Sequence, residues 1–228
     1  MKNTLSSLLA LLAIALCPET NAGSATWNLN PTDNLWNTAE NWTPATVPNS
    51  ESDVATFSVS NISDITDEGA TDIHDADTNL SGIVFTSDAS AYTLRTTPNS
   101  STTYSRFIVF LGAGIVNDSG KIQNFINQAA AEPEEHDPGA IWFESSSSAG
   151  ENVVITNQGS ALSDTGGGYT RFGLQFADTP SAGKAMFINE GGKVSGTVSG
   201  GVTDLVDFST AESATFINQP GEVEGAAA

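Results

Sequence analysis

Short apolar stretches, separated by polar turns that contain glycine, recur along most of the chain. FINEGGKVSG at residues 187–196 returns as FINQPGEVEG at 216–225, and a looser version, VITNQGSALSD, stands at 154–164. The apolar residues, the Asn and the Gly are kept in these copies, whereas the charged residues change. The kept positions are therefore expected to pack inside a repeated structure, and the variable positions to face solvent.

Two sets of residues recur at similar intervals. Asn127, Asn157, Asn189 and Asn218 are separated by 30, 32 and 29 residues, and Phe143, Phe176 and Phe208 by 33 and 32. Such intervals are typical of solenoids, in which successive coils stack and equivalent residues lie above one another. We therefore expect a structural ladder of Asn157, Asn189 and Asn218 and a second one of Phe143, Phe176 and Phe208, each rising by about 5 Å per step.

Apolar residues at alternating positions predict three short strands in each coil. The first lies around IWF, LQF and VDF at 141–143, 174–176 and 206–208, the second ends at the repeated Asn, and the third lies around Leu162, Val194 and Val223. Each Asn is expected at a corner, where its amide bonds its own turn and the Asn of the next coil. This arrangement predicts an all-β fold, a parallel β-helix.

The segment 27–60 does not follow the repeat. It carries Trp27, Trp36 and Trp42 among Asn, Pro and Thr. Because the end of a solenoid exposes strand edges and apolar core, we expect this segment to be an N-terminal cap. The alternative is that the three Trp residues form an aromatic platform for carbohydrate.

The opposite end is expected to be open. PGEVEGAAA aligns with GGKVSGTVS of the preceding unit, and the sequence stops where the next strand is expected. An apolar edge of this kind is expected to continue into, or pair with, another segment. The predicted organisation is a signal peptide at 1–25, the cap at 26–60 and β-helix repeats at 61–228.

The N-terminus predicts export. Lys2 precedes an apolar run from Leu5 to Leu16, which is too short to span a bilayer and is typical of a signal peptide, with cleavage expected after Ala22 or Ala25. Lipidation of Cys17 is the alternative. Cleavage removes Cys17, the only cysteine, so the mature chain is expected to have no disulfide and no membrane-spanning segment.

Charge excludes one class of partner. The formal net charge is −20, with only seven Lys and Arg in 228 residues. A chain this acidic repels phosphate backbones, so nucleic acid is not an expected partner. Surface polysaccharide or matrix components are compatible partners.

Both histidines lie among carboxylates. The ligand candidates in the first loop are Asp72, His74, Asp75 and Asp77, and those in the second are Glu134, Glu135, His136 and Asp137. Such groups bind calcium or a transition metal in other proteins, but neither loop has the ligand spacing of a known calcium loop. We expect solvated acidic loops and no cofactor, with a divalent cation such as calcium as the alternative.

No catalytic motif emerges from the spacing of the residues. A polysaccharide lyase or hydrolase requires paired acids at a set separation, or a basic residue beside an acidic cluster. The basic residues are scattered without a recurring acidic partner, and the sequence contains no nucleophile elbow, Walker loop or dinucleotide fingerprint. No catalytic residue is predicted.

Several motifs resemble bacterial exported proteins with autotransporter-associated β-strand repeats. They are WNxxxNWxPxxVPN from Trp36, DVATF at 53–57, GAGIVNDSG at 112–120 and the AxFINxGG units. Many such proteins end in a PEP-CTERM sorting tail or an outer-membrane barrel, and this sequence shows neither. The resemblance implies a right-handed parallel β-helix on the outside of a Gram-negative type cell, with no catalytic residues to transfer.

The function predicted from these observations is that of a non-enzymatic, secreted or cell-surface, adhesin-like structural protein. The alternatives are a carbohydrate-binding module that uses the N-terminal Trp cluster, and a polysaccharide lyase or hydrolase built on a β-helix.

Overall fold

The computed structural model describes residues 23–67, 77–98, 107–130, 132, 137–195 and 199–226. Its strands form two sheets, and the remaining regular element is a short 3₁₀ helix, η1 (Ala39–Asn41). The eight-stranded sheet contains β1 (Ala25–Trp27), β2 (Trp42–Thr43), β3 (Ser50–Phe57), β5 (Thr78–Phe85), β7 (Phe107–Asn117), β9 (Ala140–Phe143), β11 (Tyr169–Phe172) and β13 (Val202–Leu205). The six-stranded sheet contains β4 (Asp64–Asp67), β6 (Thr93–Thr96), β8 (Gln123–Asn127), β10 (Val153–Asn157), β12 (Met186–Asn189) and β14 (Thr215–Asn218).

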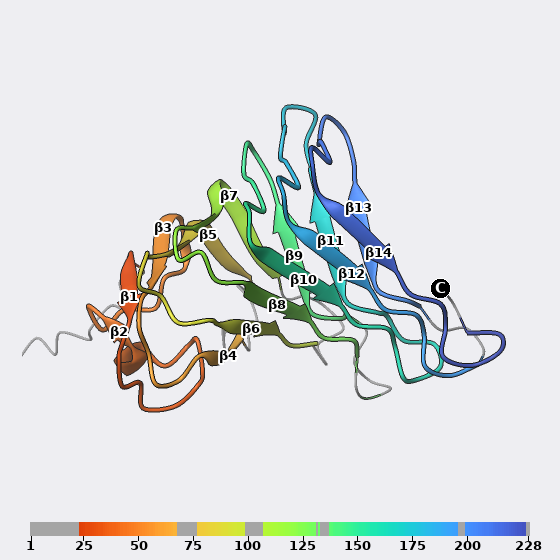
Figure 1. Cartoon of the computed structure of the whole chain (residues 1–228), viewed down its shortest axis with the longest axis horizontal. Helices are drawn as coiled ribbons and strands as arrows, with labels where there is room; N and C mark the ends of the chain where they lie inside the picture. The colour runs from red at the N-terminus through yellow and green to blue at the C-terminus, as the bar shows by residue number, and fades with distance from the viewer. Residues whose placement is uncertain are drawn as a thin grey trace, which may run out of the picture.

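The chain is a parallel β-solenoid, as the repeats predict. From β3 onward, strands alternate along the chain between the two sheets, and each strand inside a sheet pairs in parallel with the strands one coil before and one coil after it, whereas β4, β13 and β14 at the sheet ends have one such partner. The result is a stack of about 6 coils, and Figure 1 shows the strands of successive coils side by side from the N-terminal to the C-terminal end. One coil could not bury its apolar residues alone, so the stack supplies the core.

The predicted Asn ladder is confirmed. Asn127, Asn157, Asn189 and Asn218 are register partners at the ends of β8, β10, β12 and β14. The Nδ2 of each of the first three donates to the Oδ1 of the next Asn in the column, at 2.7, 2.8 and 2.8 Å. The column begins one coil earlier with Thr96, whose hydroxyl donates to Asn127.

The predicted Phe ladder is wrong. The register partners of Phe143 in the core are Phe172 and then, through Phe172, Leu205. Phe176 is 88% exposed and Phe208 is 64% exposed, because β11 and β13 have already ended and both residues lie in turns. Equal spacing therefore marked equivalent positions of the repeat without distinguishing strand from turn.

The third predicted strand is also wrong. The segments around Leu162, Val194 and Val223 contain no strand in the part of the chain that the structure describes. The coils are joined on another side by isolated parallel bridges, which run through Gly114, Ser148, Ser181 and Thr210.

The N-terminal cap is confirmed. Trp27, Trp36 and Trp42 are fully buried and pack edge-to-face, with ring centroids 5.1 Å apart for Trp27 and Trp42 and 4.8 Å for Trp36 and Trp42. They close the core above Phe57, and the two-residue strand β2 covers β1 in antiparallel pairing. Because no ring face is exposed, the alternative of a carbohydrate platform made of these residues is wrong.

Candidate functional site

Most of the predicted metal ligands lie outside the described residues. These are Asp72, His74, Asp75, Glu134, Glu135 and His136; Asp77 and Asp137 are described, and both are partly buried. Within the described ranges, no group of three or more His, Cys, Asp or Glu side chains is placed so that it could hold a metal ion. The metal-binding alternative for the two loops stays a prediction.

The outer face of the eight-stranded sheet carries two rows of side chains near its C-terminal end. Strand alternation points Ile141 and Phe143 into the core and leaves Trp142 outside. Register then places Trp142 beside Arg171 of β11 and, beyond it, Asp204 of β13. The adjacent row runs from Ala140 through Tyr169 to Val202.

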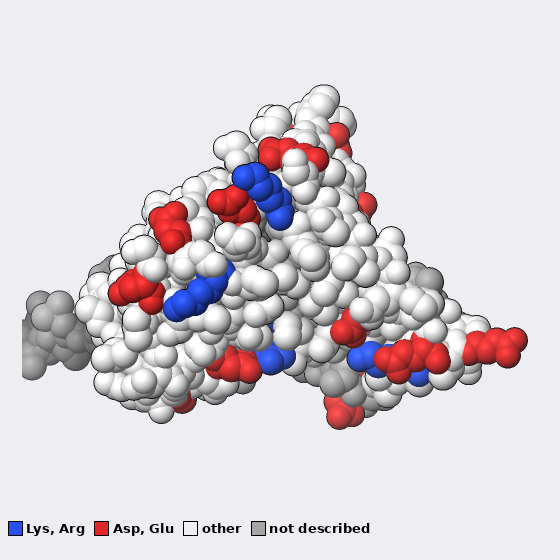
Figure 2. Space-filling view, viewed as in Figure 1, with Lys and Arg blue, Asp and Glu red and all other residues white. Residues whose placement is uncertain are grey.

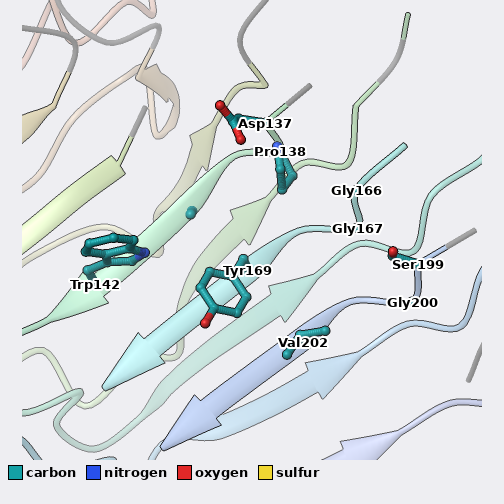
Figure 3. Close-up of a pocket in the computed structure, with 10 residues that line it drawn as sticks. Asp137, Pro138, Trp142, Gly166, Gly167, Tyr169, Ser199, Gly200 and Val202 are labelled. Carbon is teal, nitrogen blue, oxygen red and sulfur yellow. The ribbon is translucent and has the colours of Figure 1, made fainter. Parts of the chain in front are cut away.

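A pocket with a volume of about 300 Å³ lies over these rows. Its walls are Trp142, Tyr169 and Val202, and the small Ala140 leaves the hollow between them. Figure 3 shows the Trp142, Tyr169 and Val202 side chains on three neighbouring strands, β9, β11 and β13. The pocket is therefore assembled from three successive coils and does not exist in any one of them.

The turns that precede the three strands form the rim of the pocket. They contribute Asp137, Pro138, Gly166, Gly167, Ser199 and Gly200. The turns are closely packed: a Cβ on Gly166 would lie 3.0 Å from Pro138, and one on Gly167 would collide with the carbonyl oxygen of Gly200. Glycine is thus required at this rim because successive coils approach each other closely there. As a consequence, no side chain projects from these positions of the rim.

Two charged side chains beside the pocket, Arg171 and Asp204, already make contacts within the protein. The Arg171 guanidinium lies 5.6 Å from the centroid of the Trp142 ring, in a cation–π arrangement. The Tyr169 hydroxyl donates a hydrogen bond to Asp204 Oδ2 at 3.1 Å. Burial, and then the negative charge of Asp204, raise the pKa of the Tyr169 phenol, which keeps its proton at neutral pH. Both aromatic rings are held in place by these contacts.

Two buried acids, Glu144 and Asp178, lie next to the end of β9. Burial, and then the neighbouring Asp178 carboxylate, raise the pKa of Glu144. Asp178 accepts hydrogen bonds from the backbone N–H groups of Ser145, Leu174 and Gln175 at 3.0, 3.0 and 2.9 Å. These contacts tie two coils together, so they give Asp178 a structural role in the turn.

Of the two aromatic residues that line the pocket, the sequence places one on the outer face and gives no signal for the other. Trp142 stands between two apolar residues of a predicted strand, and alternation alone places it on the outer face. Tyr169 follows GGG and carries no comparable signal, because its position depends on where β11 begins. The pocket itself depends on register between coils, which no local pattern contains.

The face drawn in Figure 2 carries Lys, Arg, Asp and Glu in small separate groups on a largely uncharged surface. Within the described residues, no helix is both long enough and apolar enough to cross a membrane.

Comparison with known proteins produced no match. No protein-family model matches the chain, and neither curated proteins nor solved structures include a significant match. The resemblance to autotransporter-associated repeats therefore stays a prediction from the motifs.

Proposed function

We propose that this chain is a non-enzymatic, adhesin-like protein, exported to the outside of a Gram-negative type cell, in which the solenoid holds a binding pocket on its outer face. The observation that supports the proposal most is the pocket lined by the partly buried aromatic rings of Trp142 and Tyr169 and built across β9, β11 and β13. Pockets with largely apolar walls and a few polar groups at the rim are typical of ligand-binding sites.

The stack is suited to a structural role because its coils are joined by continuous interactions. Backbone pairing, the Asn ladder and stacked aromatic rings such as Phe143 on Phe172, at 4.5 Å between centroids, run from coil to coil. A solenoid of this kind behaves as a nearly one-dimensional stack with a long lateral surface. Such a surface suits contact with an extended polymer of the cell surface or matrix.

The experiment is expression of the full chain with a C-terminal epitope tag in a Gram-negative host. We expect tagged protein in the medium or on intact cells, with a new N-terminus at Gly23 or Thr26 after removal of the signal peptide. Tagged protein that keeps Met1 and is protected from external protease would contradict export.

A second measurement separates binding from catalysis. Purified protein is incubated with insoluble cell-surface polysaccharide, and bound protein and released reducing ends are both measured. We expect retention on the polymer and no release of reducing ends or unsaturated products. Product release that depends on the protein would instead support the lyase or hydrolase alternative.

A further inference from the structure

We propose that the pocket between Trp142, Tyr169 and Val202 binds a pyranose unit of a neutral polysaccharide whose hydroxyls are equatorial, such as a β-linked glucan. This inference rests on the proposed function, because it names the ligand class for that pocket. It replaces Trp27, Trp36 and Trp42, which are buried, with residues on the outer face.

The walls match the apolar faces of such a sugar. When the hydroxyls of a pyranose are equatorial, its axial C–H groups form two apolar faces, and these pack on aromatic rings. Arg171 lies over one face of the Trp142 ring, so the aromatic surface left for a sugar is the part of Trp142 that lines the pocket, together with Tyr169. Val202, which is 44% exposed, extends this surface into the next coil. Removing this apolar surface from water is favourable.

The rim supplies the polar complement. The Asp137 carboxylate and the Ser199 hydroxyl lie at the turns that border the pocket, together with the glycine backbone. These groups can accept or donate hydrogen bonds at the edge of a ring whose hydroxyls point outward, which is how a largely apolar pocket fixes the orientation of its ligand.

Charge favours a neutral ligand over an anionic one. Arg171 already lies over Trp142, and Asp204 accepts a hydrogen bond from Tyr169, so each of these two charged side chains makes a contact within the protein. Asp137 adds a negative charge to the rim, and the chain carries a formal net charge of −20. A uronate or sulfated sugar would therefore be repelled. The same contact makes a cationic ligand less suited, because Arg171 occupies the place of a cation at the indole.

Size and position favour one unit of a longer polymer. A volume of about 300 Å³ stands at the low end of small-molecule sites. The pocket lies on the lateral face of the sheet, across three coils, so a bound unit leaves room for its polymer to continue along the surface.

The test is titration of purified protein with cellohexaose and laminarihexaose, followed by calorimetry and tryptophan fluorescence. Polygalacturonate oligosaccharides and a proline-rich peptide serve as the other arms. We expect the neutral hexasaccharides to bind and both others to bind at least about tenfold more weakly, a difference of about 1.4 kcal/mol. Preference for polygalacturonate or for the peptide, or no binding of either hexasaccharide, would overturn the proposal.

Variants locate the binding. Trp142→Ala is expected to weaken hexasaccharide binding at least about tenfold, and Val202→Lys, at an exposed position, is expected to do the same by filling the hollow. Phe176→Ala removes an exposed aromatic ring that does not line the pocket and is the matched control, with wild-type affinity expected. Thermal unfolding checks that each variant is folded. If the Trp142→Ala variant does not fold, the test depends on Val202→Lys. A folded Val202→Lys variant that binds the hexasaccharides with wild-type affinity would overturn the proposal.

The outcomes separate this inference from the function on which it rests. If the Trp142→Ala and Val202→Lys variants bind cell-surface polysaccharide as well as wild type does, the pocket is not the binding site. The adhesin-like function would still be supported by that result. If a hexasaccharide binds at the pocket and the protein also releases reducing ends, the pocket assignment is supported and the proposal of a non-enzymatic function is contradicted.

Discussion

Asn157 shows how one buried polar side chain joins successive coils. Its Nδ2 donates to Asn189 and to Thr203, at 2.8 and 3.0 Å. Its Oδ1 accepts from Asn127 and from Thr170, at 2.7 and 2.8 Å. An amide side chain has two donors and two acceptor sites, and all four are used here. The kept Asn of the repeat is thus explained by hydrogen bonding in the core, where an unpaired group is costly.

Replacing Asn157 with Ala is expected to lower the free energy of unfolding by about 3 kcal/mol, because partners on both sides lose a buried hydrogen bond. The matched control is Asn218→Ala, at the exposed last strand, for which we expect a loss below about 1 kcal/mol. Urea denaturation followed by circular dichroism measures both. Equal losses in the two variants would show that the ladder does not depend on burial.

Glu144 makes a prediction about pH. Burial, Asp178 and, more weakly, Asp77 and Glu51 raise its pKa, while Arg171 lowers it. A carboxyl whose pKa is higher in the folded chain binds its proton more tightly there. Its contribution to stability is therefore lost as pH rises from the unfolded pKa to the raised folded pKa, and the deprotonated group is a cost above that range.

Glu144→Gln is accordingly expected to stabilise the protein at neutral pH relative to wild type, and to remove this part of the pH dependence. Unfolding free energies measured in urea at several pH values between about 4 and 7 give the comparison. The difference between variant and wild type should shrink as the pH falls. A difference that does not change with pH would mean that Glu144 titrates as it does in the unfolded chain.

The strands show which parts of the fold were predictable. The Asn column was predictable because the side chain itself is required at one corner, so its identity marks one place in every coil. The Phe column was not, because any position of a repeat recurs with the same spacing, whether it lies in a strand or in a turn. Gly173, with φ of +85°, lies between Phe172 in the core and the exposed Phe176, so the turn at Gly173 ends the strand before Phe176.

For the candidate site, Trp142 was predictable from alternation, whereas the hollow beside it depends on register between coils.

The corners before β9, β11 and β13 give a prediction for these elements. Each begins directly after a glycine, and at Gly168 a Cβ would collide with the carbonyl oxygen of Asn127. Gly168→Ala is expected to destabilise the protein by about 2–3 kcal/mol, since backbone must move. In protein expressed without residues 1–22, Gly23→Ala is the control: its Cβ would meet only Thr46 at an ordinary 3.5 Å, and we expect a change in stability of less than about 0.5 kcal/mol. Thermal unfolding compares the two; a Gly168→Ala protein as stable as the control would contradict the packing at this corner.

The two ends of the described stack differ in how they meet solvent. At the N-terminal end three buried Trp rings and the antiparallel strand β2 cover the first coil. At the other end, within the described residues, β13 and β14 have a paired neighbour on one side only, and Phe216 and Ile217 of β14 are 37% and 40% exposed. Edge strands that carry apolar side chains pair with other chains. Among the described residues, β13 and β14 are therefore a surface through which two copies can meet.

The chain of 228 residues is therefore expected to self-associate through this edge as its concentration rises, which sedimentation velocity over a concentration series would detect. Ile217→Lys places a charge on the edge strand and is expected to weaken association at least about tenfold. Leu29→Lys adds the same charge at an exposed position near the capped end and should leave association unchanged. Equal weakening by both substitutions would attribute association to net charge, and a monomer at every concentration would show that the edge is not used. Either result would mean that the open coil is protected by something other than a second copy.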